Sequence, residues 1–103
     1  MEFEWDDRKA EYNLQKHGVS FIEAATVFYD PLSITFDDPD HSDDEDRFII
    51  IGTSAQARLL IVAHTDRGDR IRIISARTLK PRERRLYESG NQHTSRGRSA
   101  RGI

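Results

Sequence analysis

The sequence contains no cysteine and no long hydrophobic run. Without cysteine the chain cannot form disulfides, thiolate metal sites or a thiol nucleophile. No apolar run reaches the roughly 18 residues that a membrane-spanning helix needs. The N-terminal segment MEFEWDDRKAEY is acidic and lacks the apolar core of a secretory signal. We therefore expect a cytoplasmic protein with no membrane partner.

Several common site motifs are missing as well. The sequence has no nucleophile elbow and no phosphate-binding glycine loop. Its four histidines show no paired metal-ligand spacing. The acidic stretch 37–46 lacks the glycine and the terminal glutamate of an EF-hand loop, which favours a solvated loop over a calcium site. The sequence thus predicts neither a metal nor a cofactor.

Charge is unevenly distributed along the chain. The net charge is −2, but residues 1–46 carry 14 acidic and three basic side chains, whereas residues 47–103 carry four acidic and 13 basic ones. Such asymmetry indicates a polyanionic partner for the basic half. The alternative is that the two halves neutralise each other within one fold, and composition alone does not choose between them.

Two helices are predicted near the N-terminus. Asp6 and Gly18 have the chemistry of an N-cap and a left-handed C-cap around a helix over 7–17. A second helix starts with the S-x-x-E capping box at 20–23 and ends before Pro31. On the first helix one face carries Ala10, Leu14 and His17.

A short edge strand at 2–5 and four later strands are predicted. The later four cover 32–36, 48–51, 59–65 and 70–77. In the first of these, Leu32, Ile34 and Phe36 alternate with polar residues and are expected to point inward. The continuous apolar runs of the next two are typical of central strands covered on both faces.

The remaining segment contains one more helix and a tail. Pro81 suits the first turn of a helix that we expect to end at about Glu88. The segment 90–103 is rich in Gly, Ser and Arg and is predicted to be a disordered basic tail. We therefore expect a single α+β domain over residues 1–89, with two N-terminal helices, a small antiparallel sheet and one C-terminal helix.

Arginines are concentrated on the predicted strands and on the last helix. The simplest hairpin registers place Arg47, Ala63 and Arg72 in one row, and they pair Arg58 with Arg77 on the other face. A small residue between two arginines leaves room for a phosphate. The alternative is that these arginines cover strand ends and pair with the acidic loop.

The last helix has three side chains of interest. Arg82 and Arg85 are three residues apart and lie side by side. Tyr87 is either a half-buried anchor, which the sequence favours, or a phenol that stacks on a base and transfers a proton.

Metal-free RNA cleavage fits this set of residue types best. It needs only arginine, lysine, histidine, tyrosine and a carboxylate, because the 2′-OH of the substrate is the nucleophile. The protein positions the backbone, moves two protons and stabilises a doubly charged phosphorane.

Several segments, taken together, carry a specific resemblance. They cover roughly residues 3–88 and read FEWDDRKAEYNLQKHGVSFIEAATVF, DP, EDRFIIIG, LLIVAHTDRGDRIRIISAR and RERRLYE. This combination resembles the BrnT family of type II toxins. The resemblance implies a RelE-like fold and an endoribonuclease that inhibits translation. It also implies that a BrnA-type antitoxin with a ribbon-helix-helix part neutralises the toxin. Operator DNA is then bound only through the antitoxin.

The resemblance also points to site residues. As catalytic residues we expect Lys16, His17, Glu45, Arg47, Arg72 and Arg77, and less directly Tyr87 and Glu83. From the charge pattern, further RNA contacts are expected from Arg58, Arg67, Arg70, Arg82 and Arg85. Two alternatives stay open: Lys16 and His17 suit the C-terminal end of a helix, and Glu45 could simply pair with Arg47.

Overall fold

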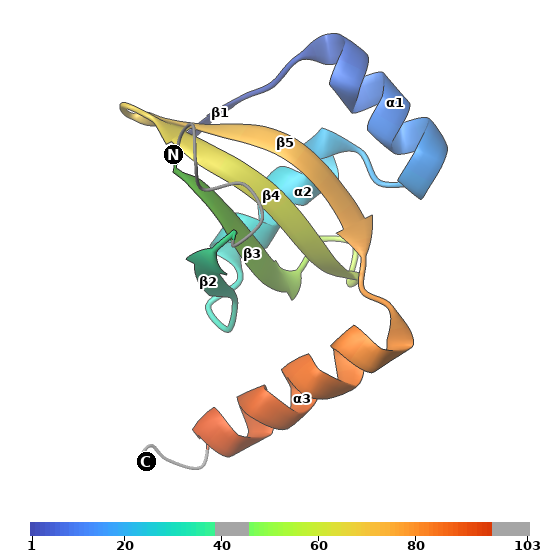
Figure 1. The fold of residues 1–103 in the computed structure, drawn as a ribbon, viewed down its shortest axis with the longest axis vertical. Helices are drawn as coiled ribbons and strands as arrows, with labels where there is room; N and C mark the ends of the chain where they lie inside the picture. The colour runs from blue at the N-terminus through green and yellow to red at the C-terminus, as the bar shows by residue number, and fades with distance from the viewer. Residues whose placement is uncertain (39–45, 96–103) are drawn as a thin grey trace.

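The computed structural model describes residues 1–38 and 46–95, with side chains up to residue 89 (Figure 1). Its elements are β1 (Glu2–Glu4), α1 (Asp7–His17), α2 (Phe21–Thr26), the 3-10 helix η1 (Val27–Tyr29), β2 (Ile34–Asp37), β3 (Arg47–Thr53), β4 (Leu59–Arg67), β5 (Arg70–Thr78) and α3 (Pro81–Ser95). The α+β fold, with two helices before the main strands and one after them, is as predicted.

The helix caps near the N-terminus follow the local chemistry of the sequence. The Asp6 carboxylate accepts hydrogen bonds from the backbone N–H groups of Arg8 and Lys9 and so starts α1. Gly18 ends that helix with φ = 70°, a left-handed conformation that costs glycine little. Ser20 accepts a hydrogen bond from the Glu23 N–H and starts α2. These three predicted caps are confirmed.

The sheet has the strand order β1-β5-β4-β3-β2 in the described part of the chain. The neighbours β5, β4, β3 and β2 are antiparallel, but β1 lies parallel to β5, with Glu4 beside Arg72. The four later strands form the expected antiparallel sheet, and the parallel strand β1 at its edge makes the whole sheet mixed. The reason is topological, because the helices α1 and α2 lie between β1 and the hairpins and return the chain in the same direction.

The hydrophobic core lies between one face of the sheet and the helices α1 and α2 (Figure 1). Its largest fully buried side chains are Phe21, Leu60, Ile73, Val19, Val27 and Val62. We call the opposite side the open face. There Ile49, Ile51 and Ile61 are half-buried, so the expectation that the central strands are covered on both faces is wrong.

The orientation predicted for the strand at 32–36 is also wrong. Ile34 and Phe36 pair with Ile51 and Ile49, which places them on the open face, and each is 44% exposed. Leu32 precedes the strand and is 65% exposed. Apolar and polar side chains do alternate along β2, but β2 is an edge strand and its apolar side points away from the core.

Both hairpin registers differ from the prediction by two residues. The turn between β4 and β5 is centred on Gly68 and Asp69, with Gly68 at φ = 65°, so that Arg67 faces Arg70. The row across three strands is therefore Arg47, Thr65, Arg72 and not Arg47, Ala63, Arg72. Because a shift of two residues preserves the face, the two arginines still flank one residue.

Helix α3 begins at Pro81, as predicted, and continues to Ser95. It therefore extends beyond the expected end at about Glu88 and includes the first residues of the segment predicted to be disordered. Once formed, a helix gains one hydrogen bond per added residue, and no proline follows Pro81 to stop it. The rest of the predicted tail, 96–103, lies outside the described residues. In the described part of the chain, no helix has the length and apolar character needed to cross a membrane.

Candidate nucleic-acid interface on the open face

A β-bulge in β5 brings three polar residues onto the same face of the sheet. His64 pairs with Ile73 and Ala63 pairs with Ser75, which leaves Ile74 as an extra residue between them. Without this extra residue, Arg72 and Arg77 would point to opposite faces, because five positions separate them. With it, Arg72, Ser75 and Arg77 lie opposite Thr65, Ala63 and Ile61 respectively. The bulge therefore places Ser75 and Arg77 on the open face, together with Arg72.

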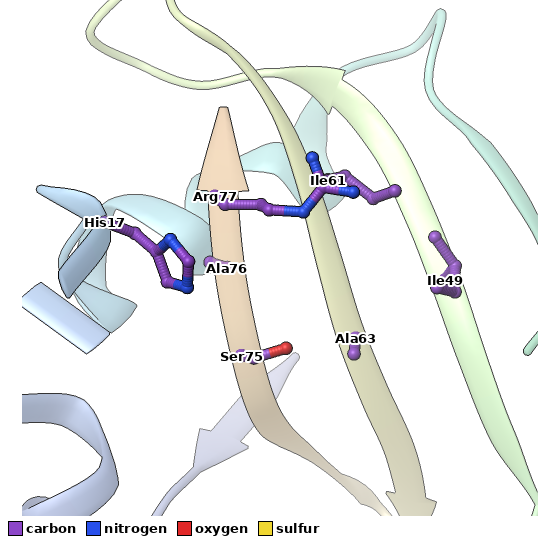
Figure 2. A pocket seen from close by; sticks show the side chains of 7 residues that line it. All are labelled: His17, Ile49, Ile61, Ala63, Ser75, Ala76 and Arg77. Atoms are coloured by element: carbon purple, nitrogen blue, oxygen red, sulfur yellow. The ribbon is translucent and has the colours of Figure 1, made fainter. Parts of the chain in front are cut away.

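A hollow of ≈ 210 Å³ lies on this face beside the bulge (Figure 2). Its lining residues are His17, Ile49, Ile61, Ala63, Ser75, Ala76 and Arg77. Figure 2 shows the Arg77 side chain reaching across the sheet towards Ile61 and the Ser75 hydroxyl pointing towards Ala63. The hollow thus combines an aliphatic floor with a guanidinium, a hydroxyl and an imidazole at its rim.

His17 enters the hollow from outside the sheet. It is the last residue of α1, and the left-handed Gly18 turns the chain away directly after it. The imidazole is half-buried and lies on the α1 side of β5 in Figure 2. The His17 imidazole and the Arg77 guanidinium therefore line the same hollow.

Arg77 is oriented by a carboxylate on α3. Its Nη1 and Nη2 atoms donate to the two Glu83 oxygens, each at 2.9 Å, and Nη1 also donates to the Thr78 carbonyl at 3.2 Å. The Arg77 guanidinium lowers the pKa of Glu83 to about 2, and the bonds to Glu83 raise the pKa of Arg77. These contacts use three of the five guanidinium donors, so donors remain for an anionic ligand.

The arginines at the other end of β5 pair with β1. Arg72 Nη1 lies 2.9 Å from Glu4 Oε2, and Arg70 lies 3.4 Å from Glu2 and 3.8 Å from Glu4. The parallel pairing of β1 with β5 makes these residues direct neighbours. Of the two predicted alternatives, ion pairing is therefore present for Arg70 and Arg72, with acids from β1. Residues 39–45 of the predicted acidic loop lie outside the described residues.

Arg58 is engaged on the helix-covered side. Its Nε atom donates to Glu23 Oε2 at 2.9 Å, and Nη2 donates to Glu23 Oε1 and to the Gly18 carbonyl. The predicted pairing of Arg58 with Arg77 is wrong, because Arg77 lies opposite Ile61. The predicted and observed partners of Arg77 differ because the shifted turn and the bulge both lie between Arg58 and Arg77 in the chain.

The other expected site residues lie away from the hollow. Lys16 is exposed and lies over the Tyr12 ring at 5.6 Å, and the Tyr87 hydroxyl donates to the Leu32 carbonyl at 3.1 Å. Arg67 lies at the β4–β5 turn, and Arg82 and Arg85 are exposed on α3. Glu45 lies outside the described residues, whereas Arg47 is half-buried on the open face in the row with Thr65 and Arg72.

Two polar residues escaped the sequence prediction: Ser75 lines the hollow, and Asn13 bonds Ala76, which lines it too. Ser75 reaches the open face only because of the bulge, and nothing in the residue pattern of β5 indicates that bulge. Asn13 lies on α1 and is 4% exposed. Its position as a polar residue on the side of the helix that faces the sheet was the one sign of its role in the sequence. Buried polar side chains are almost always hydrogen-bonded, so an inward asparagine indicates a specific partner.

One family model matches the chain, and one solved structure has a similar fold. The family model described as ribonuclease toxin, BrnT, of type II toxin-antitoxin system matches residues 5–83, which is more than half of the chain. The fold is similar to the crystal structure of the Brucella abortus ribonuclease toxin BrnT, with a TM-score of 0.62 and 23% sequence identity, over 78% of this chain and 97% of that one. No curated protein matches the chain.

Proposed function

Since this chain belongs to the BrnT family of ribonuclease toxins of type II toxin–antitoxin systems, we propose that it is a metal-independent endoribonuclease whose active site is the hollow on the open face. The observation that carries the proposal is the bulge of β5, which puts Arg72, Ser75 and Arg77 on one face beside His17.

The chemistry follows from the groups at the hollow. The RNA 2′-OH attacks the adjacent phosphorus, and the 5′-oxygen of the next nucleotide leaves. Arg77 and, along the same face, Arg72 and Arg47 neutralise the charge that develops on the phosphorane. His17 transfers a proton to or from the reacting oxygens. The products are a 2′,3′-cyclic phosphate or 3′-phosphate and a 5′-hydroxyl end.

A second proton-transfer group is needed beside His17. Lys16, Tyr87 and Glu45 are the remaining candidates for it. The hydrogen bond from Tyr87 to the Leu32 carbonyl supports an anchoring role for the phenol, which leaves Lys16 and Glu45 as the stronger candidates. Arg67, Arg70, Arg82 and Arg85 extend the basic surface along which the rest of the RNA binds.

The family assignment also implies an antitoxin partner. We propose a BrnA-type antitoxin with a ribbon-helix-helix part, which neutralises this chain in the cytoplasm and alone contacts operator DNA. Inhibition of translation follows from the cleavage of RNA. The basic open face supports this proposal, because it suits an acidic antitoxin segment as well as RNA.

The test is cleavage of a defined RNA by the purified chain in excess EDTA. We expect the wild type to cut and to leave 5′-hydroxyl ends. His17→Gln removes proton transfer and should lower the rate by a factor on the order of 10² to 10⁴. Arg77→Ala removes phosphorane stabilisation and should lower it by a factor on the order of 10² to 10³.

Two variants act as controls in the same assay. Arg84→Ala removes an exposed arginine of α3 that pairs with Glu88, and it should leave the rate unchanged. Tyr87→Phe removes only the phenolic hydroxyl, and a small effect supports the anchoring role. If the wild type binds RNA but leaves it intact even with ribosomes added, or if it cuts only with a divalent metal, the proposal is wrong.

A further inference from the structure

One buried side chain joins α1, which carries His17, to β5, which carries Arg72 and Arg77. Asn13 Nδ2 donates to the Ala76 carbonyl at 2.7 Å and to the Val19 carbonyl at 2.9 Å. The Ala76 N–H donates to Asn13 Oδ1 at 3.0 Å. A single amide thus contacts α1, the segment after it and β5, and it is 4% exposed.

These hydrogen bonds imitate a neighbouring strand. The pairing of β1 with β5 covers residues 70–72 and does not extend to Ala76. At Ala76 the side-chain amide of Asn13 engages both the N–H and the C=O that a further strand would bond. The contact therefore fixes the position of α1 along β5. Apolar packing alone does not fix this position, because hydrophobic attraction has no direction.

This contact also determines where His17 lies. Asn13 and His17 are four residues apart in α1 and so share one face of the helix. Ala76, the residue that Asn13 holds, lies between Ser75 and Arg77 and lines the hollow together with His17. The bond to the Val19 carbonyl in addition holds the chain that follows Gly18. The helix end that carries His17 is thus fixed on both sides.

We infer that Asn13 is a positioning residue, which sets the place of the His17 imidazole relative to Arg77 through its paired hydrogen bonds to Ala76. Asn13 itself does not touch substrate. The catalytic part of this inference rests on the proposed function, in which His17 transfers a proton. The structural part does not, because the position of the imidazole can be measured without RNA.

The test compares Asn13→Ala with a matched control, Thr26→Val. Thr26 Oγ1 makes two hydrogen bonds, to the Glu23 carbonyl and from the Ala55 N–H, and they join α2 to the β3–β4 turn and not α1 to β5. Valine keeps the shape of the threonine side chain and removes both hydrogen bonds. Each variant is examined by NMR of the His17 imidazole and by RNA cleavage kinetics. If Asn13→Ala does not fold, Asn13→Ser is measured in its place.

We expect Asn13→Ala to shift the His17 ring signals and to lower kcat by a factor on the order of 10 to 100, since small misplacements of catalytic groups are costly. KM should change little, because the arginines remain. Thr26→Val should lower stability but leave the His17 signals and kcat as they are.

Two results would overturn the inference. One is an unchanged His17 spectrum and kcat in the Asn13 variant, and the other is an equal change in Thr26→Val, which would indicate general loosening. If the wild type fails to cleave RNA, the proposed function fails, yet the NMR comparison still decides whether Asn13 positions His17.

Discussion

His64 is a histidine of the core, and its surroundings set its charge. The side chain is 5% exposed and lies against the rings of Phe28 and Phe48, with centroid distances of 4.8 and 5.7 Å. Its Nδ1 atom has no hydrogen-bond partner in the described part of the chain. Burial lowers the pKa of His64 below its usual 6.5, because the apolar surroundings disfavour the imidazolium.

The stability of the protein should therefore fall as the pH drops below about 6.5. Above this value His64 is neutral in both the folded and the unfolded chain. Below it the unfolded chain binds the proton first, so protonation favours unfolding. Urea unfolding at pH 7.5 and pH 5.5 measures this loss. In His64→Phe the loss should be smaller, and an equal loss in both proteins would show that another group causes it.

Single residues differ in how far the sequence predicts their roles. Asp6, Gly18 and Ser20 act on atoms two to four residues away, so local spacing was enough to predict their caps. The partners of Asn13 and Arg58 lie 63 and 35 residues away, at Ala76 and Glu23. Such contacts depend on the packing of whole elements, and one sequence does not contain that information in its local pattern.

At the scale of elements, α2 is joined to the β3–β4 hairpin by a buried carboxylate. The Glu23 side chain is 2% exposed and accepts bonds from Arg58 and, at 2.7 Å, from the Ser54 hydroxyl. The hydrogen bonds from Arg58 lower the pKa of Glu23 and outweigh the opposing effect of burial. The guanidinium thus keeps α2 and the hairpin together, in a role distinct from the RNA contact that the charge pattern predicted.

Arg58→Ala should therefore destabilise the fold without slowing the chemistry. It leaves the Glu23 carboxylate buried without a cation, so it should lower the urea midpoint more than Glu23→Gln, which removes the charge itself. The rate of RNA cleavage per folded molecule should stay at the wild-type value. A large loss of cleavage in fully folded Arg58→Ala would instead assign Arg58 to RNA binding.

The sheet shows where prediction from the sequence stopped at this scale. The sequence indicated the strands, the turn residues and the apolar alternation. Arg47 and Arg72 still lie in one row, although both hairpin registers differ from the prediction by two residues. The bulge at Ile74 was not predicted, because the extra residue is apolar like Ile73 before it. It changes the face of Arg77, and with it the composition of the site.

At the scale of the whole molecule, the structure shows one of the two meanings considered for the charge asymmetry, and the polyanionic partner stays a prediction. Part of the asymmetry is neutralised internally, since the acidic strand β1 pairs with Arg70 and Arg72 of β5. Arg77 is paired with Glu83 as well, but two of its five donors remain for an anionic ligand at the hollow that it lines with His17. The predicted family is confirmed by the match over residues 5–83, whereas its site residues stay predictions.

The most direct test of the open face as the active site is an NMR titration of the full chain with a 2′-O-methyl RNA, which lacks the attacking hydroxyl and stays intact. We predict that the signals of His17, Thr65, Ser75 and Arg77 change first, and that those of Thr26 and Ser54 on the helix-covered side do not. Changes confined to α2 and the β3–β4 hairpin, with the open face unaffected, would contradict the account.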